Sequence, residues 1–369
     1  MPNRLRSFLL QFAAPVASVV FAVVLSAIVL KVAGSNPFAA FGDMIDHGTK
    51  LETVVDMLNR ATPLYISGVA AAIGFKMNLF NIGVEGQYLL GAFFGAAAGG
   101  VFSPPGFLHV LWILLVAMTV GAAWAGLAGV LKTTRGVSEV ISTIMLNSIA
   151  ASGIVAWLSV EWREGGLSTN SGTKTIAESG HIFDLNWLLE IFTPDIKGGR
   201  ELSGVLVLAA IVGIGYHLFV NRSRVGFDLR ASGYNPFAAR AGGVPPKRMV
   251  LMAMLLSGAV AGLVGMVDIL SRNHRYDQNF TPGIGFDGIA VALLGRNHPV
   301  GIAVAAMLFA FLDASSSILQ ISGSASREII TIMKGVILLA AVISYEFARR
   351  VREREEVRMA SISMEGAVA

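Results

Sequence analysis

Seven polar side chains stand in or beside long apolar runs, where they could line a path for a polar solute and where the three carboxylates could also carry protons: Asn81, Glu85, Gln87, Glu139, Thr143, Asn147 and Asp287. A carboxylate in an apolar membrane segment is costly, so it is by default a candidate functional group. Thr143 and Asn147 follow Glu139 at intervals of four residues, which places the three on one face of a helix. Such a face suits a path for a polar, uncharged solute. The same groups could instead form hydrogen bonds between helices or cap helix N-termini.

The helices that carry these residues are predicted to lie in a membrane. Of the 369 residues, 54% are hydrophobic and only 14% are charged, whereas a soluble domain carries roughly 25% charged residues. Because each spanning helix needs about 20 apolar residues, we expect an all-α integral membrane protein with about ten transmembrane helices. The apolar run between 284 and 295 is too short to cross straight, and it is predicted to form a broken or re-entrant helix.

The composition excludes several chemistries. The chain has no cysteine, which excludes disulfides and thiolate metal sites. Its six histidines are scattered and form no His-Glu-x-x-His pattern, so neither a metal site nor a catalytic residue is predicted. Basic and aromatic residues do not interleave in the way that nucleic-acid surfaces require, so no nucleic-acid partner is expected.

One transmembrane domain is predicted over residues 1–369. Its expected parts are a first span over 8–32, a first repeat over about 60–160, a long outside loop over 161–201, a basic segment over 221–248, a second repeat over about 249–348 and a cytoplasmic tail over 349–369. Lysine and arginine concentrate in cytoplasmic loops, and an inside N-terminus puts most of them inside. Both termini are therefore predicted to be cytoplasmic. Lys334, within the last span, is expected to extend its ammonium group to the outer surface.

Two stretches of the chain match each other. Ser67-Gly68 precedes the motif Ile82–Gly86, and Ser257-Gly258 precedes the motif Ile284–Gly288. Both motifs read Ile-Gly-x-acid-Gly, and both are followed by Leu-Leu-Gly. In the expected topology the two copies cross the membrane in opposite directions. This pattern predicts an inverted-topology repeat, and repeats of that kind build transport paths at their interface.

The segment Asn221–Arg248 is a basic island between two apolar runs, with six basic residues and one acidic residue. Asn235-Pro236 is a favourable helix start and predicts a short helix from Phe237 to Arg240. A short helix at the cytoplasmic membrane surface suits the docking of a partner, although an ordinary basic loop would carry the same charge. The chain contains no Gly-Lys dipeptide, so it has no P-loop. If transport is driven by ATP, the ATPase is a separate subunit that docks on this segment.

Four stretches resemble the permease subunit of bacterial ABC importers of the branched-chain amino acid, ribose and nucleoside group. They are NLFNIGVEGQYLLGA (Asn78–Ala92), GVSEVISTIMLN (Gly136–Asn147), the stretch Gly226–Gly265, and GFDGIAVALLGRNHPVGI (Gly285–Ile302). The wording of the first and the last is most similar to the nucleoside, or simple-sugar, permeases. The resemblance extends over about 62–345.

The resemblance implies an importer in the bacterial cytoplasmic (inner) membrane. Its expected partners are ABC ATPase subunits, a second permease that is an identical copy or a sister chain, and an extracytoplasmic substrate-binding protein, which in this family is often a lipoprotein. No cofactor is expected on this chain, because Mg-ATP would be bound by the ATPase. The ATPase-coupling positions that match the family are Gly226, Asp228, Arg230, Ala231, Gly233, Asn235, Ala238, Ala239 and Gly242.

The resemblance implies that the chain is a transport subunit, and two alternatives to the first prediction stay open. The first prediction is a permease for nucleosides, which is not itself an enzyme. The alternative within the class is a permease for a sugar or a branched-chain amino acid. The alternative of another class is a secondary transporter driven by protons through Glu85, Glu139 and Asp287.

Overall fold

The computed structural model describes residues 20–162, 172–190, 201–277, 280, 282–321, 323, 326, 328–340 and 343. This part of the chain is helical, with two isolated β-bridges and no strand among the described residues. The predicted all-α class is therefore confirmed. The chain divides into two compact units, residues 50–311 and residues 1–49 with 312–369. Residues 8–19 of the predicted first span and the predicted tail lie outside the described residues.

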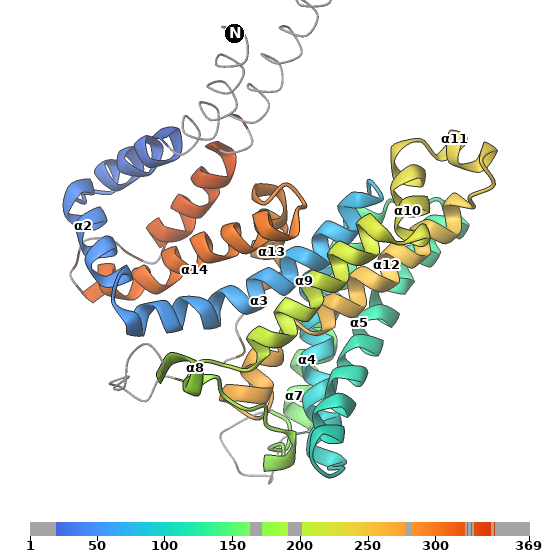
Figure 1. Ribbon diagram of the computed structural model, residues 1–369, viewed down its shortest axis with the longest axis horizontal. Helices are drawn as coiled ribbons and strands as arrows, with labels where there is room; N and C mark the ends of the chain where they lie inside the picture. Colours follow the sequence, from blue (N-terminus) through green and yellow to red (C-terminus); the bar gives the residue numbers. More distant parts are fainter. Residues whose placement is uncertain are drawn as a thin grey trace, which may run out of the picture. The chain divides into compact units, whose positions relative to one another are not determined.

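The larger unit contains the predicted first repeat, the basic segment and the predicted second repeat as far as residue 311. Its helices are α3 (Leu51–Lys76), α4 (Val84–Val101), α5 (Phe107–Arg135), α6 (Glu139–Ser148), η1 (Ile149–Val155), α7 (Ala156–Glu161), η2 (Glu178–Gly180), α8 (Asn186–Glu190), α9 (Val205–Arg222), α10 (Arg224–Tyr234), α11 (Pro236–Ala241), α12 (Pro246–Gly262), η3 (Asp268–Arg272), α13 (Ile284–Leu294) and the first part of α14 (Pro299–Ile321). Figure 1 shows α10 and α11 at one end of this unit and α8 at the opposite end.

Four helices of the described chain are long and apolar enough to cross a membrane: α5, the continuous helix Glu139–Glu161, α9 and α14. A fifth would be the bent pair formed by Val20–Val32 and α2 (Pro37–Gly48). The chain is therefore a membrane protein, and the number of ten spans stays a prediction. Helix α13 has 11 residues, which reach about 16 Å, roughly half of the hydrocarbon core.

Glycines bring α5 and α12 into backbone contact. A Cβ atom on Gly121 would overlap the carbonyl oxygen of Gly258, and one on Gly262 would overlap that of Ala117. Small residues of this kind allow membrane helices to approach closely, where van der Waals contacts then hold them. Helix α12 is thereby fixed against α5, and it also packs against α3 and α4.

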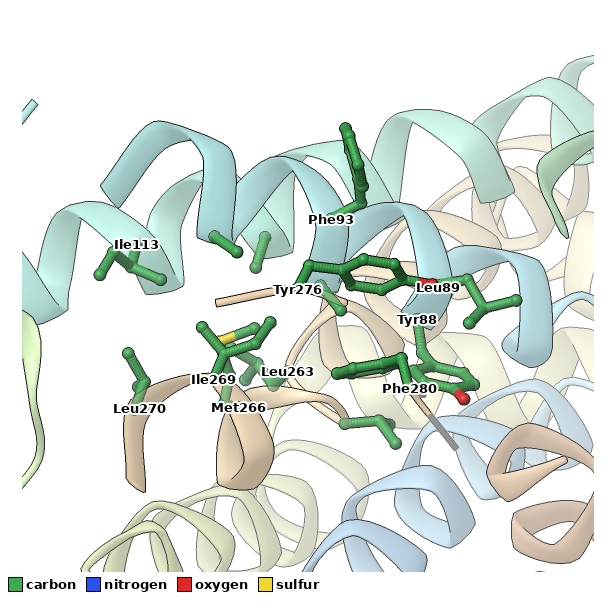
Figure 2. Close-up of a cluster of buried hydrophobic side chains, with 14 of the residues drawn as sticks. Tyr88, Leu89, Phe93, Ile113, Leu263, Met266, Ile269, Leu270, Tyr276 and Phe280 are labelled. Atoms are coloured by element: carbon green, nitrogen blue, oxygen red, sulfur yellow. The ribbon is translucent and has the colours of Figure 1, made fainter. Parts of the chain in front are cut away.

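A cluster of buried aromatic rings holds the segment that precedes α13 against α4 (Figure 2). The rings of Tyr276 and Phe280 stack with centroids 4.5 Å apart. Phe93 of α4 meets Tyr276 at 5.4 Å, and Tyr88 of α4 meets Phe280 at 5.9 Å. Tyr276 and Phe280 lie between η3 and the first residue of α13. Their contacts with the rings of α4 therefore hold the start of that short helix beside α4.

The smaller unit contains an ion pair that was not predicted. The ammonium group of Lys334 lies 2.7 Å from the carboxylate of Asp313 in the second half of α14. Lys334 is buried. The expectation that Lys334 extends to the outer surface is therefore wrong, because a carboxylate within reach satisfies the ammonium group inside the helix pair.

Candidate translocation site and coupling segment

Helix α13 begins at a glycine, and the side chain that caps it comes from α4. Gly283 at the N-cap has no side chain, yet its N–H donates to Glu85 at 2.7 Å, and the N–H of Gly285 donates to the other carboxylate oxygen at 2.8 Å. Glu85 is buried. The first N–H groups of a helix need acceptors and carry its positive dipole end, so a carboxylate is well suited to this position. Glu85 therefore joins the motif helix of one predicted repeat to that of the other.

Helix α4 is capped in the same way, by Asn147 of α6. Its own N-cap is Gly83, again without a side chain. The Oδ1 atom of Asn147 accepts from the N–H of Gly86 at 2.9 Å, and its Nδ2 atom donates to the carbonyl of Ile82 at 2.8 Å. One amide from another helix thus satisfies an N–H group in the first turn of α4 and a carbonyl just before that turn.

Asn81 and Gln87 form a reciprocal amide pair below this start. Asn81 donates to the Oε1 atom of Gln87 at 3.0 Å and accepts from its Nε2 atom at 2.9 Å. Asn81 also donates to the hydroxyl of Ser257 at 2.8 Å, and Ser257 donates to the carbonyl of Ala70 at 2.6 Å. Asn81, Gln87 and Ser257 are all buried. This chain of hydrogen bonds links α12, α3 and the start of α4.

Glu139 and Thr143 lie in the first two turns of α6, beside the turn that precedes α4. One oxygen of Glu139 accepts from Lys132 at 2.5 Å, and the other accepts from the N–H of Phe80 at 3.4 Å. Thr143 donates to the carbonyl of Glu139 within α6. Asp287 is half-buried in the first turn of α13.

The structure thus brings Asn81, Glu85, Gln87 and Asn147 together around two helix starts. Asn81, Glu85 and Asn147 make hydrogen bonds to other helices, as one of the two sequence interpretations expects, while Gln87 pairs with Asn81 in the turn before its own helix. Whether the group also lines a solute path stays a prediction. Sequence reasoning did not assign Ser257 or Lys132 to this group. The signal for Ser257 was present, because the Ser-Gly pair was part of the repeat.

The basic segment forms two helices rather than the single short helix predicted. Asn235 caps α11 by accepting from the N–H groups of Phe237 and Ala238 at 3.0 Å, as the Asn-Pro signal predicts. The preceding residues form α10, whose own cap is Ser223. Arg230 donates to the carbonyl of Val220 at the end of α9. These bonds fix the position of α10 and α11 relative to α9.

Two of the predicted coupling glycines are sites of backbone contact. A Cβ on Gly233 would lie 2.6 Å from the carbonyl carbon of Met77, and one on Gly226 would overlap the carbonyl of Phe219. Gly233 therefore seats α10 on the end of α3, and Gly226 seats it on α9. Of the other predicted coupling positions, α10 contains Ala231 and the half-buried Asp228. Helix α11 contains Ala238 and the buried Ala239, and its C-cap is Gly242.

At the opposite end of the unit, the loop after α7 packs on the segment after η3. The imidazoles of His181 and His274 stack with centroids 3.5 Å apart, and the N–H of Ile176 donates to the carbonyl of His274. A cavity of about 370 Å³ adjoins the pair, with the charged residues Asp56, Asp184, Glu201 and Arg272 in its lining. Burial and then the neighbouring His181 lower the pKa of His274.

The family of the chain follows from its match to known proteins. Residues 53–342 match the family described as the permease component of the branched-chain amino acid transport system. The chain belongs to this family. It is therefore a transport subunit of the ABC permease class rather than an enzyme, and the resemblance described above is confirmed.

Several characterised permeases are similar over most of their length. The guanosine ABC transporter permease protein NupP of Bacillus subtilis is 33% identical over 293 residues, which cover 79% of this chain and 81% of that protein. The nucleoside ABC transporter permease protein NupB of Lactococcus lactis is 29% identical, covering 93% of both chains. The glucose ABC transporter permease protein TsgB13 of Haloferax volcanii is also 29% identical, covering 95% of this chain and 92% of that one.

Proposed function

We propose that this chain is the membrane permease of an ATP-driven importer for nucleosides in the bacterial cytoplasmic membrane. Two permeases, either identical or sister chains, would form the path, with an external binding lipoprotein that delivers solute and ATPase subunits that bind Mg-ATP inside. The observation that carries the proposal is the α10–α11 segment, in a chain of the ABC permease family.

The α10–α11 segment has the surface that a docking element needs. Tyr234 is 95% exposed and Phe237 is 82% exposed, although both sit on helices fixed by caps and backbone contacts. Five basic residues in and beside these two helices are also exposed: Arg222, Arg224, Arg240, Lys247 and Arg248. Large aromatic side chains are frequent anchors of protein interfaces, and a charged rim favours a partner of opposite charge. An ATPase face with an apolar groove and an acidic rim would fit this surface.

The inverted repeat is proposed on the packing of the motif helices. Helix α3 precedes the first motif but packs on α13 of the second, while α12 precedes the second motif and packs on α4 of the first. Ser67 of α3 donates to the carbonyl of Ile284 in α13, and Ser257 of α12 donates to the carbonyl of Ala70 in α3. A reciprocal exchange is what two halves related by a two-fold axis would produce. Ten spans, with both termini in the cytoplasm, complete the proposed topology.

The mechanism we infer is alternating access. Closure of the ATPase dimer would move α10 and α11 and rock the two repeats about their interface. Solute released by the binding protein would then pass the uncharged amides and hydroxyls near the starts of α4 and α13. Nucleosides are favoured because relatives named for guanosine and nucleosides are similar over most of the chain. A sugar is the alternative that the glucose permease supports.

The proposal is tested by purifying the tagged chain from its native membrane and identifying the proteins that accompany it. An ATPase, a second permease and a binding protein are expected. The purified complex in vesicles, with the binding protein outside, should take up radiolabelled guanosine only when Mg-ATP is supplied to the ATPase. Glucose uptake in the same assay would favour the sugar alternative. Uptake by the chain alone, without ATP, would contradict the importer.

A further inference from the structure

We propose that the turn between α3 and α4, residues Met77–Gly83, transmits movement of the coupling segment to the buried polar groups at the starts of α4 and α13. We call it the relay turn. The inference rests on the proposed function, since it requires an ATPase that moves α10. It adds a specific positioning role to Gly233, Met77, Asn81 and Ser257.

The outer side of the relay turn is in backbone contact with α10. A Cβ on Gly233 would lie 2.6 Å from the carbonyl carbon of Met77 and 2.9 Å from the carbonyl oxygen of Lys76. Met77 and Leu79 are buried in a cluster that also contains Leu229 of α10 and Met254 of α12. Because interiors are close-packed and resist compression, a shift of α10 displaces whatever its backbone touches. The turn is therefore one of the parts of the helical bundle, with α9 and α12, that a shift of α10 would push.

The relay turn is held in one conformation, as a transmitting element must be. Its first N–H groups, of Met77 and Leu79, both donate to the carbonyl of Gly74. Asn78 adopts a left-handed conformation with φ of 57°, which asparagine tolerates better than most residues. The N–H of Phe80 donates to Glu139. The turn can therefore move as a body rather than absorb displacement by bending.

The inner side of the relay turn is bonded to the predicted translocation site. Asn81 donates to Ser257 and pairs with Gln87, and the carbonyl of Ile82 accepts from Asn147. The next residues begin α4, and Glu85 in its first turn holds the N-terminus of α13. Over the nine residues from Met77 to Glu85, the chain thus passes from contact with α10 to contact with the start of α13.

Continuous contact alone does not establish energetic coupling, which a double-mutant cycle can measure. The first variant is Gly233→Ala, since its added methyl group meets backbone that no side-chain rotation can relieve. The second is Ser257→Ala, which removes the hydroxyl between Asn81 and Ala70 and lies far from the exposed rings of α10 and α11. The matched control is Gly215→Ala, because a Cβ at that helical glycine of α9 would meet open space.

The measurement is solute taken up per ATP hydrolysed, in vesicles with the purified importer and its binding protein, together with the amount of ATPase bound. We expect both variants to retain ATPase and to lose about tenfold in uptake per ATP, within the range of typical coupling between sites. The double variant should be no worse than the poorer single variant, because both interrupt one route. The Gly215→Ala control should match the wild type.

Several results would overturn the inference while leaving the importer intact. Wild-type uptake per ATP in Gly233→Ala or in Ser257→Ala would show that the turn does not transmit. Losses that multiply in the double variant would show two separate routes. If Gly233→Ala loses its bound ATPase, Ser257→Ala alone tests the inference. Its uptake per ATP must then fall, and a wild-type value would contradict the inference. Failure of the wild-type chain to bind any ATPase would instead contradict the proposed function.

Discussion

Replacing Glu85 by alanine should release the N-terminus of α13. The carboxylate accepts from the N–H groups of Gly283 and Gly285 at 2.7 and 2.8 Å in a buried position. Leaving a buried donor unsatisfied costs about 1–3 kcal/mol, so the two together should cost about 4 kcal/mol. Since 1.4 kcal/mol is about a factor of ten, opening of the first turn of α13 should become roughly 10²–10³ times more frequent.

The assay is amide hydrogen exchange, read by mass spectrometry on peptides that cover 283–294, with the protein in detergent micelles. Native exchange reports such local opening. Glu85→Gln keeps one acceptor oxygen, so its exchange should be intermediate. Glu139→Gln is the matched control, because the carboxylate of Glu139 accepts hydrogen bonds from Lys132 and Phe80 rather than from α13. Wild-type exchange over 283–294 in Glu85→Ala would refute the capping role.

Three further outcomes are expected. Asn147→Leu removes the cap of α4 and should lower ATP-driven uptake without releasing the ATPase, which uptake assays and co-purification measure together. The pKa of His274 is lowered in the folded loop, so its contribution to stability is present above about pH 6.5 and is lost as the pH falls through the lowered value. Amide hydrogen exchange over residues 172–186 should therefore rise at low pH, and it should rise less in His274→Asn. Lys334→Met should destabilise the protein by about 1 kcal/mol, because it removes the ammonium group 2.7 Å from the Asp313 carboxylate, and that carboxylate is partly exposed; thermal unfolding in detergent should show partial recovery when Asp313 is also replaced by leucine.

Local patterns predicted those features whose partners lie close in sequence. Asn235 was predicted to begin a helix, and its amide caps residues two and three positions later. The four-residue spacing from Glu139 through Thr143 to Asn147 predicted one face, and all three side chains are on the buried side of α6. Helix periodicity and capping are properties of a few consecutive residues, so the sequence contains what is needed to predict them.

Partners far apart in sequence could not be predicted in this way. Glu85 was a candidate on general grounds, but its donors are about 200 residues away, and nothing in either motif states that one caps the other. Gly233 was singled out by family resemblance, whereas its physical reason is contact with the backbone of Met77. Lys334 was expected to extend outward because it lies close to the outer end of its predicted span. Only packing of a second helix supplies Asp313.

The geometry of the carboxylates weighs against the proton-driven alternative. A proton carrier needs a carboxylate that alternates between a solvent path and a protected state. Both oxygens of Glu85 are occupied by backbone N–H groups, and both oxygens of Glu139 accept hydrogen bonds, one from an ammonium group. Protonating either would break bonds that hold a helix start or the relay turn in place. These two carboxylates therefore serve as fixed joints between helices, and the energy for moving those helices is better supplied from outside the membrane, at α10 and α11.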